Sequence, residues 1–371
     1  STAQAGILED MPRLDYSGGA TCPSLLLEPQ RTNIHTNSEY LDAYVKSRSK
    51  ITSNAATSPE GVSNASKIIP LSTSNGWSGV NAPNYSFTSG QTYTLSIFAK
   101  AGEYNYCQVG GSTPAFNGSF ATINLTNGVV EHQSGITATT EDYGSGWWKI
   151  SFTHTAIATA SSPIGFLAVY STAVSSRLVT QVGDDVSGIY AWGWQAESGS
   201  YPTSYIPTYG SSVTRSKDVC NNAGDSSTFN TNQGVLFGEV RALDSSTGTN
   251  RKIVLGDGSF NNGVEFGFQT SNDSMQFIIR SGGSISMIFT TTAFDITTYN
   301  KFAISYKNNE GKIFVNGSQL STTDTSVTTP VSITQLDMQF STGFNFEGDV
   351  KQLLVFNTAL TDTELASLTT L

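Results

Sequence analysis

The stretch from Gly188 to Gly210, which runs GIYAWGWQAESGSYPTSYIPTYG, limits the possible folds of this chain more than any other part of it. Its aromatic first half predicts a β-strand, and its second half predicts an extended segment that contains Pro202 and Pro207. Each proline fixes its own φ and disfavours the helical region for the residue before it. Such a segment closes one domain and directs the chain into the next. We therefore expect one β-sandwich before it and another after it.

Short alternating stretches on both sides of this segment support that expectation. Residues 92–100, 121–125 and 147–153 each place apolar side chains at every second position, as strands with one buried face do. In the last of these, Trp147 falls on the face opposite the apolar set. Asn-Gly pairs at 127–128 and 316–317 predict hairpin turns. The fold class is therefore all-β, with two tandem antiparallel β-sandwiches.

The alternation also assigns side chains to faces within residues 189–194. Tyr190, Trp192 and Trp194 fall on one face of the predicted strand, opposite Ile189 and Ala191. We interpret the aromatic row as core because it lies in the strand that closes the domain.

Composition and pattern divide the chain into four parts. Residues 1–33 lack periodicity and predict an N-terminal tether, and residues 34–209 form the first sandwich. The stretch 210–228 is rich in Ser, Asn and Asp and predicts a linker, and residues 229–371 form the second sandwich. Near its end, Thr361 and Glu364 have the spacing of a capping box, which predicts one short helix. The chain opens at Ser1 with neither an initiator Met nor a signal-like segment, so we expect a piece of a longer or processed protein.

The charge balance excludes several classes of partner. Charged residues are 13% of the chain, about half of what an ordinary soluble domain carries, and the net charge is −10. Nucleic acid needs clustered Lys and Arg, so we expect no nucleic-acid partner. No apolar run approaches 18 residues, which predicts no membrane insertion. Three scattered cysteines, Cys22, Cys107 and Cys220, do not make a disulfide framework.

Several phrases of the sequence resemble a known architecture. Gln195-Ala-Glu197, the run from Tyr201 to Pro207, and Thr214-Arg215 resemble the end of a jelly-roll domain, similar to carbohydrate-binding modules, in bacteriophage tail-fibre and tail-spike proteins. The phrases from Met11 to Gly19 and from Pro23 to Asn33 resemble the segment that precedes that domain. The last 140 or so residues resemble a laminin G-like, concanavalin A-type sandwich. The resemblance implies a virion tail location, a cell-surface or extracellular polysaccharide as partner, and other fibre subunits as further partners.

The residues offer little for catalysis, and we expect no enzyme. There is no phosphate-binding loop, no metalloprotease histidine pair and no nucleophile elbow, and the three histidines lack metal-ligand spacing. Glycosidases need a pair of carboxylates, but the stretches around Glu239 and Glu265 each lack the second one. A pair assembled from separate strands stays open at this point.

Aromatic and amide side chains are the candidates for binding sugar, because sugar rings stack on flat apolar groups while their hydroxyls need polar partners. Tyr104, Tyr106 and Gln108 share one face of a predicted strand, opposite Cys107 and Val109, which we assign to the core. We therefore predict a carbohydrate-binding face at these three residues, with contributions from the loop residue Trp77 and from Trp147. The alternative is that the tyrosines only cover the edges of the core.

The sequence calls for no cofactor, and it leaves open whether a structural calcium ion is bound. Asp184-Asp185 and the loops 257–263 and 341–347 are its candidate positions, although plain turns explain all three.

Two rival functions accompany the assignment to a phage tail protein. One is an accessory carbohydrate-binding region of a secreted polysaccharide-degrading enzyme, and the other is a purely structural fibre segment.

Overall fold

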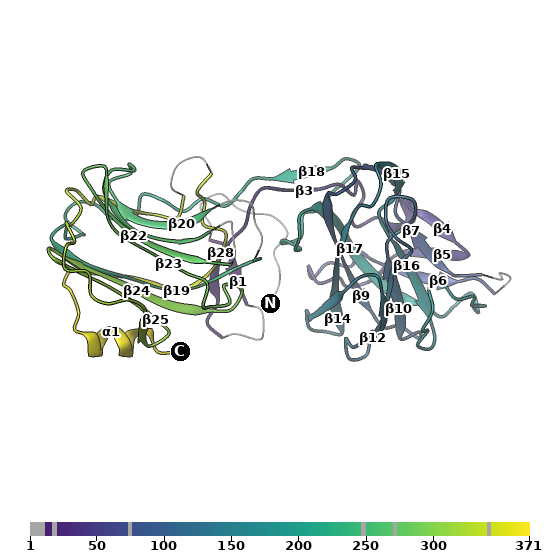
Figure 1. The fold of residues 1–371 in the computed structure, drawn as a ribbon. Coiled ribbons are helices and arrows are strands. Elements are labelled where there is room, and N and C mark those ends of the chain that lie inside the picture. The colour runs from purple at the N-terminus through teal and green to yellow at the C-terminus, as the bar shows by residue number, and fades with distance from the viewer. Residues whose placement is uncertain (1–11, 17–20, 73–75, 246–249, 270–272, 340–342) are drawn as a thin grey trace. The chain divides into compact units, whose positions relative to one another are not determined.

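The computed structural model describes residues 12–16, 21–72, 76–245, 250–269, 273–339 and 343–371. This part of the chain forms two compact units (Figure 1). Unit 1 comprises residues 30–216, and unit 2 comprises the flanking residues 12–29 and 217–371. Every strand pairing in both units is antiparallel, which confirms the predicted all-β class and the two sandwiches.

Unit 1 is built from two six-stranded sheets and two small strand pairs. The first sheet has the order β12-β11-β10-β16-β7-β4, with β4 at Val45–Ser47, β7 at Gly79–Asn81, β10 at Tyr106–Gly110, β11 at Phe120–Asn124, β12 at Val130–Ser134 and β16 at Phe166–Tyr170. The second has the order β13-β14-β9-β17-β6-β5, with β5 at Ser49–Ala56, β6 at Ala65–Pro70, β9 at Thr92–Lys100, β13 at Ala138–Asp142, β14 at Trp147–Thr155 and β17 at Ile189–Ser198. The pairs are β8 (Asn84–Phe87) with β15 (Ala160–Pro163), and β3 (Arg31–Asn33) with β18 (Val213–Arg215).

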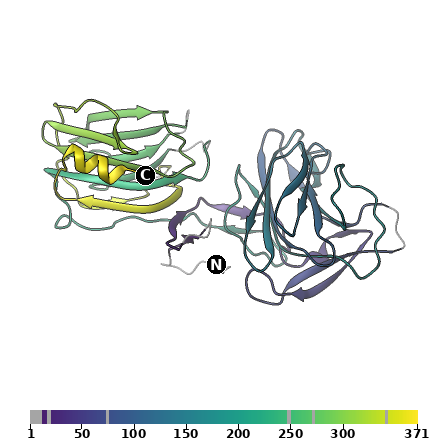
Figure 2. The same ribbon diagram turned by 90° about the horizontal axis from the view of Figure 1, so that it is seen from below.

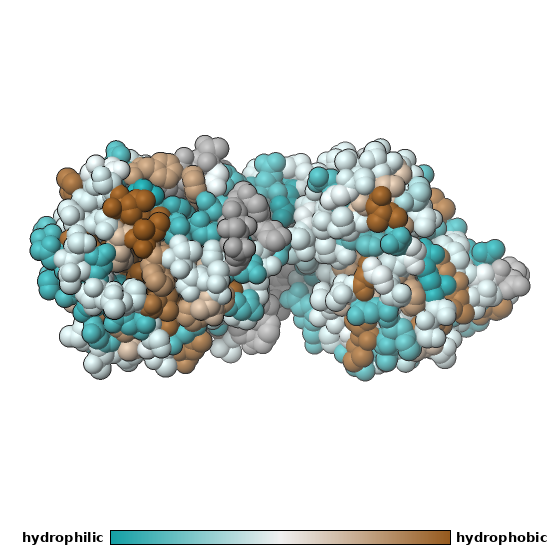
Figure 3. All heavy atoms as spheres, in the orientation of Figure 1, coloured by the Kyte–Doolittle hydropathy of each residue, from teal (hydrophilic) through white to brown (hydrophobic). Residues whose placement is uncertain are grey.

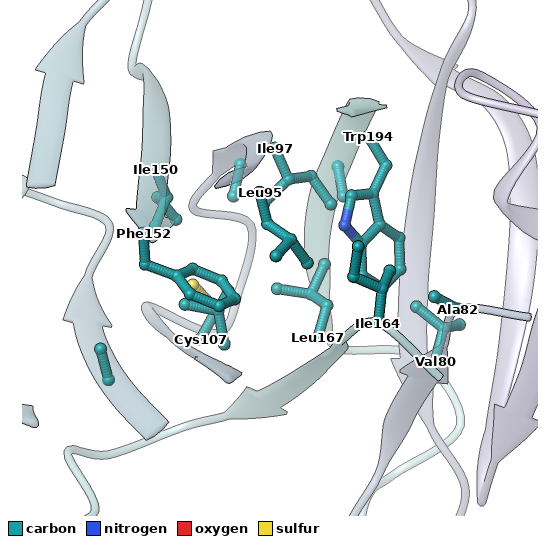
Figure 4. Close-up of a cluster of buried hydrophobic side chains, with 14 of the residues drawn as sticks. Val80, Ala82, Leu95, Ile97, Cys107, Ile150, Phe152, Ile164, Leu167 and Trp194 are labelled. Atoms are coloured by element: carbon teal, nitrogen blue, oxygen red, sulfur yellow. The ribbon is translucent and has the colours of Figure 1, made fainter. Parts of the chain in front are cut away.

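The core of unit 1 follows the predicted alternation. Leu95, Ile97, Ile150 and Phe152 point from β9 and β14 into the cluster that Cys107 enters from β10 (Figure 4). The bounds of β9 coincide with the predicted stretch 92–100. Alternation was a reliable guide here because each strand has one buried face and a regular pleat.

The aromatic row of β17 does not keep to one face, so that prediction is wrong. A register shift against β9 lies between Trp192 and Gln195, and Gly193 in this bulge has a φ of +64°. The extra residue turns Trp194 into the main core, next to Leu95 and Leu167 (Figure 4), while Trp192 packs on the opposite face. A bulge of this kind breaks the two-residue period that the prediction assumed.

Unit 2 is a sandwich of a seven-stranded and a five-stranded sheet. The larger has the order β1-β2-β28-β19-β24-β25-β26, with β1 at Leu14–Asp15, β2 at Ser24–Leu27, β19 at Gln233–Ala242, β24 at Asn300–Lys307, β25 at Glu310–Val315, β26 at Ser318–Gln319 and β28 at Gly348–Phe356. The smaller has the order β23-β22-β21-β20-β27, with β20 at Arg251–Gly256, β21 at Gly263–Phe268, β22 at Met275–Ser281, β23 at Ser284–Thr291 and β27 at Gln335–Asp337.

Two local predictions for unit 2 are confirmed. Asn316 and Gly317 both have positive φ between β25 and β26, as a type I′ turn requires. The helix α1 (Asp362–Thr369) begins at the predicted capping box of Thr361 and Glu364. It packs Leu365 against Phe237 and Phe314 of the larger sheet, and Figure 2 shows it in yellow across that sheet. No helix among the described residues is long and apolar enough to cross a membrane.

The N-terminal segment differs from the predicted tether of residues 1–33. β2 pairs with β28, and Leu27 enters the core of unit 2 at 4% exposure. Residues 31–33 instead form β3 of unit 1, paired with β18, so the predicted linker 210–228 contains a strand of unit 1. Unit 1 is thus an insertion between two pieces of unit 2. Three-residue strands carry too few side chains to show a period, which is why the sequence did not reveal them.

Candidate functional site

The face predicted to bind sugar is covered in the structure. Cys107 and Val109 lie in the core as predicted, but Gln108 on the other face is fully buried beneath residues 171–182, which we call the covering loop. Its Nε2 donates to the Ser176 carbonyl (3.0 Å), and its Oε1 accepts from the Leu178 backbone N–H (2.7 Å). The expectation that Gln108 is exposed is therefore wrong, because the amide is used to bind backbone.

Tyr106 and Trp77 pack against apolar side chains under the covering loop. Both are half-buried and pack on a cluster that includes Phe166 and Tyr170 of β16. Further bonds hold the loop in place: the Thr122 hydroxyl donates to the Val174 carbonyl at 2.8 Å. Tyr104 is also half-buried, against the main core. The structure supports the alternative that the tyrosines cover core edges, and a sugar contact at Tyr104, Tyr106 or Trp77 stays a prediction.

Trp147 is buried as well, with 2% of its surface exposed. Its indole N–H donates to the Thr57 carbonyl at 3.0 Å, and it belongs to a small aromatic cluster with Phe98 and Trp192. Tyr205 from residues 200–209, which we call the crossing segment, packs on this cluster. The expectation that Trp147 is exposed is wrong because the outer face of its sheet is covered too.

A different set of side chains combines exposed rings with buried polar groups. Glu39 is 6% exposed, and its Oε1 accepts hydrogen bonds from the hydroxyls of Tyr209 (2.9 Å) and Tyr205 (3.2 Å). Its Oε2 accepts from Asn64 Nδ2 at 3.0 Å. Glu39 precedes the 3₁₀ turn η2 (Leu41–Ala43), Asn64 precedes β6, and the tyrosines come from the crossing segment. Three segments distant in sequence thus converge on one carboxylate.

The outer side of this cluster presents two aromatic rings to solvent. Tyr40 is 54% and Tyr209 60% exposed, and their rings meet edge to face with centroids 6.2 Å apart. The Tyr209 ring is held because its hydroxyl is bonded to Glu39. A ring fixed before a ligand arrives loses less rotamer entropy on binding. We call Tyr40, Tyr209, Glu39 and Asn64 the tyrosine platform.

The electrostatics of the tyrosine platform are acidic. Burial raises the pKa of Glu39, the nearby Glu60 raises it further, and the three hydrogen bonds partly oppose this. Burial and the hydrogen bond to Glu39 raise the pKa of Tyr209, so its hydroxyl is a donor throughout the physiological range. Two carboxylates beside the rings disfavour an anionic ligand and suit the hydroxyls of a neutral one.

Sequence reasoning missed the tyrosine platform for identifiable reasons. Residues 38–46 show no regular alternation, and η2 within them directs Tyr40 outward. Tyr209 lay in a segment interpreted as a joint between domains. The signal was present in the tyrosines of Ser38-Glu-Tyr40 and Pro207-Thr-Tyr209, but only the bridge between Asn37 and Tyr209 brings the two phrases together.

The positions considered for metal and for catalysis are occupied by local interactions. Asp184 accepts from the backbone N–H groups of Val186 and Ser187 and from the Ser187 hydroxyl, and these bonds lower its pKa to about 2. Among the described residues, no group of three or more His, Cys, Asp and Glu side chains is arranged to hold a metal ion. A calcium ion stays a prediction.

The two glutamates of unit 2 that were considered for catalysis, Glu239 and Glu265, lie in different sheets. Glu239 is in β19 and faces Lys351 at 3.4 Å, while Glu265 in β21 accepts from Lys252 and Arg280 at 2.6 Å each. A glycosidase pair must flank one bond, and these two carboxylates do not share a face.

The two loops of unit 2 that were considered for calcium, 257–263 and 341–347, meet through their phenylalanines. Phe260 is 42% exposed and contacts the Phe344 ring edge to face at 5.5 Å. Asp257 in the first loop accepts from Ser259 and Asn262, as expected of a plain turn. Ser341 and Thr342 of the second loop lie outside the described residues.

Comparison with known proteins supports the assignment of the second sandwich. Residues 241–366 match a laminin G-type family described as the concanavalin A-like lectin/glucanases superfamily. No curated protein matches the chain at a significant level.

Among solved structures, the chain is similar to the sialidase carbohydrate-binding module CBM40 of Ruminococcus gnavus, at 14% identity and a TM-score of 0.32, over 41% of this chain and 95% of that one. It is similar to a SAP-like pentraxin of Limulus polyphemus, at 11% identity and a TM-score of 0.31, over 39% and 72%. It is also similar to domains LG4-5 of the mouse laminin alpha1 chain, at 9% identity and a TM-score of 0.27, over 96% and 95%. The family match and the sandwich fold agree, and residues 241–366 are a laminin G-like, concanavalin A-type domain.

Proposed function

We propose that this chain is a non-catalytic glycan-binding region and that unit 1 binds a neutral polysaccharide on the tyrosine platform. The observation that carries the proposal is a pair of exposed tyrosine rings, one of them anchored to a buried carboxylate. Stacking on such rings supplies apolar contact, and the acidic surroundings select against anionic sugars.

The biological setting that we propose is a phage tail fibre or tail spike, where the region recognises a polysaccharide on the host surface. The phrases in residues 195–215 and 11–33 support this setting through their resemblance to tail proteins. An accessory region of a secreted polysaccharide-degrading enzyme is the rival setting, and it predicts the same binding surface.

A purely structural fibre segment is the second candidate function. It is favoured by Gln108 and Trp147, two predicted sugar contacts that bind backbone of unit 1 instead. The two candidates differ in a simple way, because a structural segment binds no glycan at all.

The test begins with a glycan array of neutral and acidic polysaccharides on the full chain, followed by titration of the best neutral oligosaccharide. We expect Tyr40→Ala to weaken binding roughly tenfold, which corresponds to about 1.4 kcal/mol. Its melting temperature should stay unchanged because the ring is 54% exposed. No reducing ends should appear on prolonged incubation.

Two matched variants locate the site. Tyr106→Ala should lower the melting temperature and leave the affinity unchanged, because its ring packs under the covering loop. Phe260→Ala removes an exposed ring of unit 2 and should change neither the melting temperature nor the affinity. Weakened binding in Phe260→Ala but not in Tyr40→Ala would move the site to unit 2, and no binding to any glycan would favour the structural segment.

A further inference from the structure

The edge strands of the four large sheets differ in how they are protected against pairing with another chain. Proteins protect sheet edges by keeping strands short, by placing charges on them, or by bulges. Short edge strands of two or three residues are β1, β4, β26 and β27. Longer ones that carry charged side chains are β5 with Lys50, β12 with Glu131, and β13 with Glu141 and Asp142.

β23 is the exception over its second half, which has neither a charge nor a bulge. It is an edge strand of eight residues, and residues 281–294 around it contain no Asp, Glu, Lys, Arg or His. Ile285 and Ile288 are 49% and 51% exposed. Figure 3 shows hydrophobic side chains gathered on the face of unit 2 on which β23 lies in Figure 1.

The free side of β23 is regular over its second half. Ser286 has no partner in the register with β22, so a bulge lies there, and its hydroxyl accepts from the Thr328 backbone N–H at 2.6 Å. Beyond the bulge, Met287–Thr291 pair with β22 without interruption. Among the described residues, no backbone hydrogen bond joins the other side of these five residues to a further segment. They offer a row of backbone donors and acceptors to an incoming strand.

We infer that unit 2 self-associates through β23, by antiparallel pairing of Met287–Thr291 with the same residues of a second copy. The neutrality of this edge and its self-complementary register favour a second copy as the occupant. Two copies of a chain with a net charge of −10 repel one another over most of their surfaces, but residues 281–294 bring no charge to the contact. Self-pairing also places Ile288 of each copy on the same outer face of the joined sheet, opposite Thr290 and diagonally across from Ile288 of the second copy.

The experiment is sedimentation of the full chain over a wide range of concentration. We expect a reversible monomer–dimer equilibrium, and Ile288→Lys should raise the dimer dissociation constant at least tenfold. Ile285→Lys is a second variant with the same expected direction. Leu354→Lys is the matched control, since it replaces an exposed apolar residue of the interior strand β28 and should leave the equilibrium unchanged.

Amide exchange gives an independent readout, because the amides of 287–291 on the free edge should gain protection as concentration rises. A chain that stays monomeric at millimolar concentration would overturn the inference. So would a dimer that Leu354→Lys disrupts as much as Ile288→Lys, or one in which exchange at 287–291 is unchanged. Melting curves confirm that each variant is folded before its sedimentation is interpreted.

Discussion

Unit 1 and unit 2 are both antiparallel sandwiches, but they cover the outer faces of their sheets differently. In unit 1, irregular segments cover both faces: the covering loop bonds to Gln108, and the crossing segment bonds to Gln195, whose Oε1 accepts from the Ile206 N–H at 2.6 Å. In unit 2, α1 covers one face through apolar contacts, and the other carries the ion pairs of Glu265 with Lys252 and Arg280.

Because of this difference, polar side chains on the outer faces have a different structural role in each unit. A segment without regular structure has unpaired backbone groups that must be satisfied when it is buried. In unit 1 the amides of Gln108 and Gln195 satisfy them, so these residues are structural. A helix satisfies its own backbone, so unit 2 needs no such amides under α1. The predictions below test this division, starting with the largest expected effect.

Deleting residues 1–29 should affect unit 2 alone. The deletion removes β1 and β2, the core residue Leu27, and the ion pair of Arg13 with Asp218. Truncating one buried leucine to alanine costs about 2–5 kcal/mol, so we expect a loss of about 5 kcal/mol or more when the strand pairing is lost as well. Calorimetry should show the unit 2 transition lowered or absent and the unit 1 transition unchanged. Leu27→Ala is a milder form of the same test, and Leu14→Ala, at a residue 44% exposed, is its control. Two unchanged transitions would instead support a simple tether.

Trp147→Ala should destabilise unit 1 by about 3–5 kcal/mol, since it leaves a large cavity beside Phe98 and Trp192. The measurement is the unit 1 transition in chemical denaturation. A variant with normal stability but reduced glycan affinity would show that Trp147 contacts sugar after all.

Gln108→Ala should cost about 2–3 kcal/mol, because the Leu178 N–H and the Ser176 carbonyl lose their partner under the covering loop. Hydrogen exchange should accelerate in residues 171–182 before the rest of unit 1. Gln276→Ala in unit 2 is the control, since that amide bonds to other side chains rather than to backbone. Equal effects of the two variants would contradict the structural role given to Gln108.

Thr361→Ala should lower the stability of unit 2 by about 1 kcal/mol, through loss of the cap of α1. Unit 1 should not respond. A unit 2 transition that stays in place would mean that α1 contributes little to covering the sheet.

Glu39→Gln should produce the smallest change, seen as a difference in pH dependence. Burial raises the pKa of Glu39, so the folded chain holds its proton to a higher pH than the unfolded chain. The free energy of unfolding therefore falls as pH rises from the ordinary value of 4.5 through the folded pKa. The variant should lack this contribution to the pH dependence of stability. The contribution of Glu197, whose pKa is also raised by burial, should remain. Parallel pH profiles for wild type and variant would show that Glu39 does not titrate in this way.

Sequence patterns predicted the fold class, the core strands at 92–100, 121–125 and 147–153, the capping box of α1 and the Asn316-Gly317 turn. Each depends on residues within about ten positions of one another, where strand period, turn chemistry and capping act locally. The assignment of Cys107 and Val109 to the core followed from the same local period.

Contacts between distant segments settle which outer faces are covered and where exposed rings meet buried carboxylates. Gln108 is buried by a loop some seventy residues away, and Glu39 meets Tyr209 across 170 positions. The bulge at Gly193 and the pairing of β2 with β28 likewise depend on the partner strand. Contacts of this kind leave no period in the sequence, because each is satisfied by a single side chain from a distant segment.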